Sequence, residues 1–211
     1  MGSVTIASMY GNAGSTIARE AAEELGLPLI DRAIPVEVAE RIAHPLDQAL
    51  ADDEREPRNL ATRLLDGAIS TSGLFVGVPI GHSHLGDDEN VHATEEALRK
   101  AAATGGAVVL GRAGVFVLAE RTDTLRVRLI GSPERRVFAA MRHLGVDEET
   151  SRRQLAEVDR ARAAYLDHFY PRQDWRDPEH YHLLLDSTVL SEALCTWLIV
   201  AAARDLFSRA A

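Results

Sequence analysis

A glycine-bearing turn near the N-terminus is the first candidate for chemistry. Gly11-Asn12-Ala13-Gly14-Ser15-Thr16 lies between a β-rich segment, residues 3–8, and a helical pattern over residues 17–25. Backbone N–H groups at a helix start attract anions, and glycines let a phosphate approach them closely. Thr16 is placed to offer its hydroxyl to a phosphate or a metal ion. The full pattern G-x-x-x-x-G-K-[ST] is absent, so a turn without a ligand remains an alternative.

Arginines are the second candidate group. Arg112 directly follows a buried strand and Gly111, and ligands of open α/β sheets bind at such strand ends. A guanidinium fits phosphate oxygens well. Lys100 is the only lysine beside 22 arginines, so few residues could fill a role that needs an ammonium group. The sequence therefore predicts an anion site built from arginines.

Other charged residues have plainer interpretations that stand beside a functional one. Arg135, Arg136 and Arg142 are equally compatible with a solvated helix face. Asp159 and Arg162 are spaced i, i+3, which is typical of an ion pair on a helix surface.

Histidine and cysteine give little support for metal chemistry. His82, His84 and His92 fit no tight zinc spacing, and no cysteine joins them, so we expect a hydrated loop there. The single cysteine, Cys195, lies in an apolar helical stretch and is expected to be a buried, inert thiol. One cysteine cannot form an internal disulfide, which favours a cytoplasmic location.

Composition narrows the classes of partner. The chain has 211 residues, 46% of them hydrophobic and 26% charged, as in a globular protein of one domain. Its net charge of −9 argues against a nucleic-acid surface. No leader and no run of 18 apolar residues is found, which predicts no membrane partner.

The elements that must position these residues follow from hydrophobic periodicity. Short apolar segments predict strands over 3–8, 27–31, 107–110, 125–130 and 183–186. Helical patterns cover 17–25, 35–66, 93–104, 133–144, 147–168 and 190–208. Residues 67–92 are rich in Gly, Ser and His and are expected to form a long loop. This alternation predicts an α/β fold with a five-stranded parallel sheet covered on both faces.

Six segments occur in one order over nearly the whole chain. They are Gly11-x-x-Gly14, Leu29-Ile30-Asp31-Arg32, Val109-Leu110-Gly111-Arg112, Ser132-Pro133-Glu134-Arg135-Arg136, Asp159-x-x-Arg162 and Leu185-Asp186-Ser187-Thr188. In this order the chain resembles the cytidylate-kinase-like family of P-loop nucleoside monophosphate kinases. The stretch from Asp174 to Tyr181 is similar to the segment that precedes the family's last strand.

The resemblance implies a three-layer P-loop NTPase fold in one domain. Its core would comprise residues 1–32, 93–146 and 182–211, with a monophosphate-binding insertion over 33–92 and a lid over 147–172. The implied activity is transfer of the γ-phosphate of ATP, with Mg²⁺, to CMP, dCMP or a similar small acceptor.

The resemblance also implies roles for single residues. The ATP phosphates would bind at Gly11, Asn12, Ala13, Gly14, Ser15 and Thr16, with Thr16 near Mg²⁺. The acceptor would bind at Asp31, Arg32 and Arg112. Arg112, Arg160 and Arg162 would act in catalysis. Arg152, Arg153 and Asp159 would belong to the lid.

The sequence departs from the family at the turn. Gly14 stands where cytidylate kinases carry the loop lysine, and Ser8 and Ser15 stand where relatives in the group carry arginines. Leu110 replaces the acidic residue before Gly-Arg. These departures leave open a nucleotide-binding regulatory protein with impaired catalysis. A third interpretation is an interaction domain with an empty turn that forms a homodimer.

Overall fold

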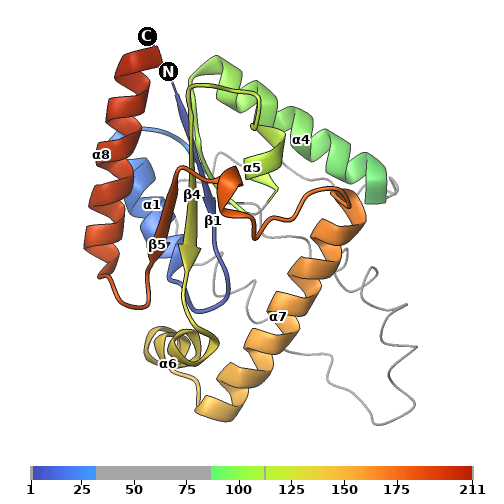
Figure 1. Ribbon diagram of the computed structural model, residues 1–211, viewed down its shortest axis with the longest axis vertical. Helices are drawn as coiled ribbons and strands as arrows, with labels where there is room; N and C mark the ends of the chain where they lie inside the picture. The colour runs from blue at the N-terminus through green and yellow to red at the C-terminus, as the bar shows by residue number, and fades with distance from the viewer. Residues whose placement is uncertain (1, 32–86, 112, 211) are drawn as a thin grey trace.

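The computed structural model describes residues 2–31, 87–111 and 113–210 of the chain (Figure 1). Five parallel strands form one sheet in the order β2-β3-β1-β4-β5. They are β1 (Ser3–Ala7), β2 (Leu29–Asp31), β3 (Val108–Leu110), β4 (Thr124–Ile130) and β5 (Leu183–Asp186). The predicted five-stranded parallel sheet is therefore confirmed.

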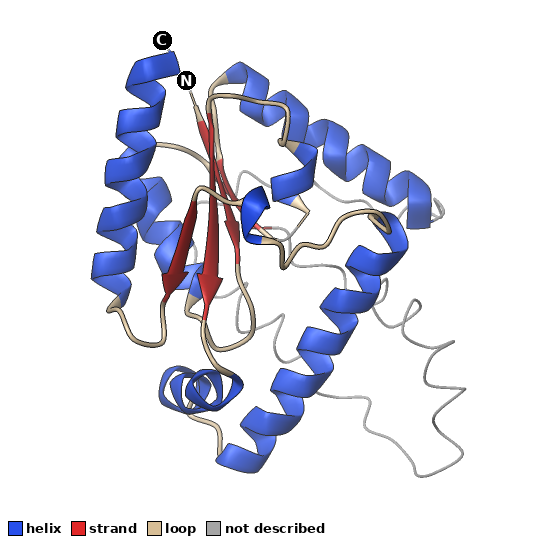
Figure 2. Ribbon diagram, in the orientation of Figure 1, coloured by secondary structure: helices blue, strands red, loops and turns tan. Residues whose placement is uncertain are grey.

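Helices cover both faces of this sheet (Figure 2). They are α1 (Gly14–Leu25), α4 (Asp87–Thr104), α5 (Gly114–Val117), α6 (Pro133–Leu144), α7 (Glu148–Phe169) and α8 (Glu192–Ala210), with a 3₁₀ turn η1 (Pro178–His180). One apolar cluster joins α1 and α8 to the sheet, and a second joins α4, α5 and α7 to its other face. The fold therefore has three layers.

Apolar and arginine side chains alternate along β4, and they point to opposite faces of the sheet. Val127 and its neighbours at alternate positions are buried in the cluster shared with α1 and α8. Arg126 and Arg128 point to the opposite face, and the Arg128 guanidinium lies 4.7 Å from the centre of the Trp175 ring. A cation over an aromatic face is a favourable contact, so this strand can hold arginines within the fold.

Local signals fix the helix ends near the sheet. Pro133 starts α6, and the Ser132 side chain accepts a hydrogen bond from the Arg135 N–H. Gly26 and Gly145 end α1 and α6 in the left-handed conformation, with φ of 65° and 67°. The predicted helices over these segments are confirmed.

Some predictions fail or lie outside the described residues. Helix α4 begins at Asp87, so the loop predicted over 67–92 is wrong for its last six residues. The helical stretch predicted over 35–66 lies outside the described residues. The short elements α5 and η1 were not predicted.

The single cysteine lies in the interior of the protein. Cys195 is fully buried, and burial raises the pKa of its thiol, as expected for an inert cysteine. Within the described residues, none of the helices combines the length and apolar character that a membrane crossing requires.

Candidate functional site: the phosphate turn and its arginines

The turn from Gly11 to Thr16 leaves the carboxyl end of β1, the central strand of the sheet (Figure 1). Gly11 and Ala13 adopt positive φ angles of 79° and 50°. The first intrahelical bond of α1 runs from the Ile17 N–H to the Ala13 carbonyl, at 3.1 Å. The N–H groups of Gly14, Ser15 and Thr16 precede this bond, and the N-cap makes no side-chain hydrogen bond. Such a helix start suits an anion.

Asn12 fixes the turn to the sheet. Its side chain is buried and donates through Nδ2 to the Leu129 carbonyl at 2.8 Å. Its carbonyl accepts a hydrogen bond from the Ser187 hydroxyl at 2.9 Å. Asn12 therefore shapes the turn and ties it to the ends of β4 and β5.

Two glycines are required by close contacts. A Cβ atom at Gly11 would lie 2.2 Å from the Arg136 carbonyl oxygen. A Cβ atom at Gly14 would lie 2.3 Å from Ser8 Oγ. The position where the resemblance places a lysine is thus filled by the side chain of Ser8.

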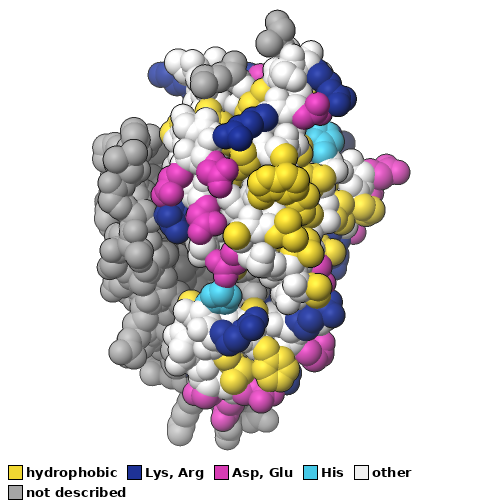
Figure 3. Space-filling model, turned by 90° about the vertical axis from the view of Figure 1, so that its left-hand side faces the viewer, with side chains coloured by type: hydrophobic (Ala, Val, Ile, Leu, Met, Phe, Trp, Pro, Cys, Tyr) yellow, Lys and Arg dark blue, Asp and Glu magenta, His cyan; other side chains and the backbone are white. Residues whose placement is uncertain are grey.

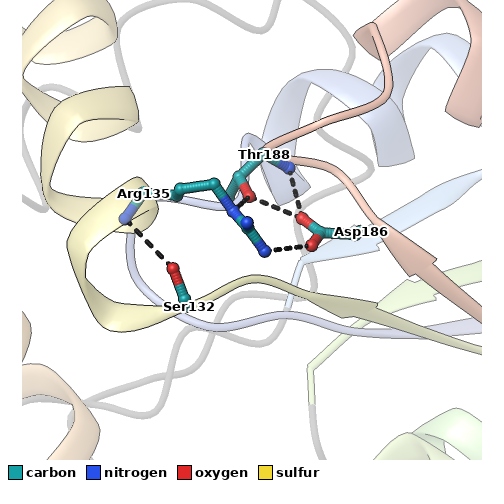
Figure 4. Close-up of polar contacts among 4 residues, drawn as sticks. All are labelled: Ser132, Arg135, Asp186 and Thr188. Atoms are coloured by element: carbon teal, nitrogen blue, oxygen red, sulfur yellow. Dashed lines mark hydrogen bonds and ion pairs between the residues drawn. The ribbon is translucent and has the colours of Figure 1, made fainter.

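Arg136 lies beneath the turn and is only 4% exposed. Its Nη1 donates to the Tyr10 carbonyl at 3.2 Å and to Asp159 Oδ2 at 2.8 Å. Of the two interpretations left open for Arg136, the solvated helix face is therefore wrong. That interpretation fits its neighbour Arg135, which is half exposed and bridges to Asp186 at 2.7 Å (Figure 4).

Arg162 approaches the same segment from α7. Its Nη1 donates to the Ser8 carbonyl at 3.3 Å. Burial lowers the pKa of the Arg162 guanidinium, while the carboxylates of Asp159 and Asp31 act in the opposite direction. The alternative of an ion pair between Asp159 and Arg162 on the helix surface does not hold, because the Asp159 side chain is mostly buried against Arg136.

A third contact joins α7 to the turn. The Tyr10 hydroxyl donates to Gln154 Oε1 at 2.5 Å. Burial raises the pKa of the Tyr10 hydroxyl, and a hydrogen bond with Ser151 offsets part of this effect. Sequence reasoning missed Tyr10 and Gln154, because neither residue type signals a phosphate site. Together these contacts hold α7, most of the predicted lid, against the turn.

The other predicted site residues are more scattered. Ser15 is exposed at the turn and Thr16 is half-buried. Asp31 is exposed at the end of β2. Exposed positions on α7 are taken by Arg152, Arg153 and Arg160. Arg32 and Arg112 lie outside the described residues.

Metal-binding residues do not gather in the described part of the chain. His92 is exposed on α4, while His82 and His84 lie outside the described residues. No cluster of three potential metal-ligating side chains is found within the described ranges.

A groove of about 320 Å³ runs between α6 and the segment after β5. It is lined by Arg135, Phe138, Met141, Arg142 and Thr188. Thr188 follows Ser187, which donates a hydrogen bond to the Asn12 carbonyl. The groove is therefore a neighbour of the turn from Gly11 to Thr16, which we call the phosphate turn after the ligand that we propose for it. Figure 3 shows hydrophobic side chains gathered on one side of the molecule. The large hydrophobic residues exposed on α8 are Leu194 and Trp197.

Comparison with known proteins bears on the family and the fold. The model of the cytidylate kinase-like family matches residues 3–189. Among solved structures, an uncharacterized protein from Eubacterium ventriosum has a TM-score of 0.61 at 17% identity, covering 97% of this chain and 99% of that chain. A gluconokinase from Sinorhizobium meliloti has a TM-score of 0.50 at 15% identity, covering 99% and 94%. The predicted P-loop kinase fold is confirmed. No curated protein matches the chain.

Proposed function

The chain belongs to the cytidylate kinase-like family, and we propose that it transfers the γ-phosphate of ATP to CMP, dCMP or a similar small acceptor. One observation carries this proposal. The open start of α1, at Gly14 to Thr16, lies next to the segment whose Ser8 carbonyl accepts a hydrogen bond from the Arg162 guanidinium. Phosphoryl transfer requires positioning and charge neutralisation more than a protein nucleophile, and this site supplies those two things.

ATP with Mg²⁺ fits the donor set of the turn. The N–H groups of Gly14, Ser15 and Thr16 would hold phosphate oxygens, and the Thr16 hydroxyl would face the metal ion. Mg²⁺ is held largely by substrate phosphates and water, so it does not require a cluster of carboxylates, and none is found in the part of the chain that the structure describes. When bound, Mg²⁺ would neutralise charge on the transferring group.

The acceptor would bind beside the turn, at the ends of β2 and β3. Asp31 is paired in register with Leu110, so β2 and β3 end side by side at the carboxyl edge of the sheet. Arg112 comes two residues after Leu110, and we assign it to the acceptor's phosphate on the strength of the family resemblance. The insertion 33–92 would complete this part of the site.

The lid would be formed by residues 147–172, most of which belong to α7. Arg162 already reaches the Ser8 carbonyl, and Arg160 is exposed on the same helix. Closure of such a segment would exclude water and so protect ATP from hydrolysis. The groove between α6 and the segment after β5 offers apolar surface and guanidinium planes to a nucleotide base.

A second candidate is a nucleotide-binding regulator without turnover. A Cβ atom at Gly14 would meet the Ser8 side chain, so position 14 itself does not accommodate a lysine in this structure. Arg136 is neutralised by Asp159 rather than available to a ligand. These contacts favour binding over catalysis.

Two experiments distinguish the kinase from the regulator. Calorimetry measures binding of ATP and Mg²⁺, and an ADP-release assay over a panel of nucleoside monophosphates then measures turnover. Turnover with CMP or dCMP supports the kinase, and binding without turnover supports the regulator. Thr16→Val should weaken ATP·Mg²⁺ binding and Thr16→Ser should retain it, and Arg112→Ala should cut turnover severely. Absence of ATP binding by the unaltered protein would refute both candidates.

A further inference from the structure

A second groove, of about 380 Å³, lies at the opposite end of the sheet from the phosphate turn. It is lined by Ala119, Arg121, Thr122, Arg126, His182 and Leu206. Residues 119–122 precede β4, whereas the phosphate turn follows β1. Because β1 and β4 are parallel, the two sites belong to opposite ends of the strands.

Arg126 brings an uncompensated positive charge to this groove. Its Nε donates to the His180 carbonyl at 2.9 Å, and its Nη1 donates to the Ala119 carbonyl at 3.1 Å. Among the described residues, no carboxylate forms an ion pair with Arg126. Burial lowers the pKa of its guanidinium. A partly desolvated cation bonded only to carbonyls is stabilised when an anion enters beside it.

Two neighbours add hydrogen-bond donors. Arg121 pairs with Asp123 at 2.7 Å, but its Nε is buried and bonds to no other group in the described ranges. His182 accepts a hydrogen bond at Nδ1 from the Arg126 backbone N–H, at 3.2 Å. A neutral imidazole that accepts at Nδ1 carries its proton at Nε2 and can donate there.

We propose that this groove is a second anion site, which binds the phosphate group of a small molecule or free phosphate. Two guanidiniums and an imidazole N–H match the several acceptor oxygens of a phosphate. The overall charge of −9 repels anions from the protein as a whole, so binding depends on these local donors. The site is independent of the phosphate turn and of the function proposed for it.

The test inserts a carboxylate without removing any donor. Thr122 is exposed at the groove, so Thr122→Asp would place a negative charge there, and Thr122→Asn is the neutral control of equal shape. Titration of ¹⁵N-labelled protein with inorganic phosphate reports on the groove through the amides of residues 119–126 and 182. It reports on the phosphate turn through the amides of Gly14, Ser15 and Thr16.

We expect the groove amides to respond to phosphate in the unaltered protein and in Thr122→Asn. Thr122→Asp should weaken that response by at least about tenfold, because its carboxylate competes for the same guanidinium. The response of the turn should be equal in both variants. Without phosphate, Thr122→Asp should melt at a higher temperature than Thr122→Asn.

Two outcomes would overturn the proposal: groove amides that do not move at millimolar phosphate, or Asp and Asn variants that bind phosphate alike. A response of the groove alone would leave this site standing while contradicting the anion site proposed at the turn. Repeating the titration with glycerol 3-phosphate distinguishes the ligand's source. Tighter binding of the ester indicates a phosphorylated metabolite, and equal or weaker binding indicates free phosphate.

Discussion

Replacing Arg136 with methionine would remove the guanidinium that joins the phosphate turn to α7, while keeping most of the side-chain volume. Arg136 is 4% exposed and its Nη1 bonds to the Tyr10 carbonyl and to Asp159. The substitution would leave a mostly buried carboxylate and a backbone carbonyl without this partner. We therefore expect Arg136→Met to lower the free energy of unfolding by about 3 kcal/mol.

The magnitude follows from burial. Removing one partner of a fully buried ion pair costs about 3–5 kcal/mol. The Asp159 side chain is 19% exposed, which places the cost at the lower end of that range. The loss at the Tyr10 carbonyl adds about 1 kcal/mol. Removing Arg136 Nε, which is buried without a hydrogen-bond partner in the described structure, recovers a similar amount. In a chain of this length the melting temperature should fall by about 6–12 °C.

The assay is urea and thermal unfolding followed by circular dichroism, with Arg135→Met as the matched control. Arg135 is 51% exposed and pairs with Asp186, so its loss should cost about 0–1 kcal/mol. In a double-mutant cycle, Arg136→Met and Asp159→Leu should be non-additive, because each single substitution removes the same ion pair. Equal losses for the two arginine variants, or additive effects in the cycle, would refute the reasoning.

Three further predictions concern the turn, the thiol and the loop after β5. Gly14→Ala should destabilise by about 1–3 kcal/mol in urea unfolding, because its Cβ meets Ser8, and adding Ser8→Gly should restore stability. Cys195 should react with a thiol reagent at pH 8 only as fast as the protein unfolds, since burial raises its pKa. Burial opposes ionisation of Asp186, but hydrogen bonds from Thr188 and the nearby guanidinium lower its pKa. The stability that ionised Asp186 contributes should be fully present above its ordinary pKa and should be lost as the pH falls through the lowered value. Asp186→Asn should therefore destabilise the protein at neutral pH and have little effect in acid. Unfolding measured at several pH values would show this difference.

Elements with strong local signals were predictable from the sequence. Pro133 marks the start of α6 and Gly26 the end of α1, and both effects act within a few residues. The start of α4 was missed although its signal is present. The sequence at that start, Asp87-Asp88-Glu89, is of the acidic kind that is common where helices begin. The surrounding glycines and histidines suggested a loop instead.

The buried role of Arg136 was not predictable. Its partner Tyr10 is 126 residues away in sequence, and its other partner, Asp159, belongs to a different helix. Which of two adjacent arginines on α6 turns inward is decided by the packing of α7 and the phosphate turn, not by the sequence around position 136. The same reason explains why Gln154 escaped notice.

The absence of the loop lysine bears more on turnover than on binding. The groups fixed around the turn are backbone amides and the Arg162 guanidinium, which is anchored to the Ser8 carbonyl. Donors that bind the substrate and the transition state equally well raise the affinity for the substrate, but they do not raise the rate of the chemical step. A faster transfer step requires a cation that contacts the phosphoryl group more closely in the transition state than in the bound substrate. Among the described residues, Arg160, exposed on α7, is the candidate nearest in sequence to the anchored Arg162. Arg160 and Arg162 are two positions apart on one helix and so lie on different sides of α7. Arg160 therefore reaches the turn only if α7 leaves the position in which Arg162 and Asp159 hold it.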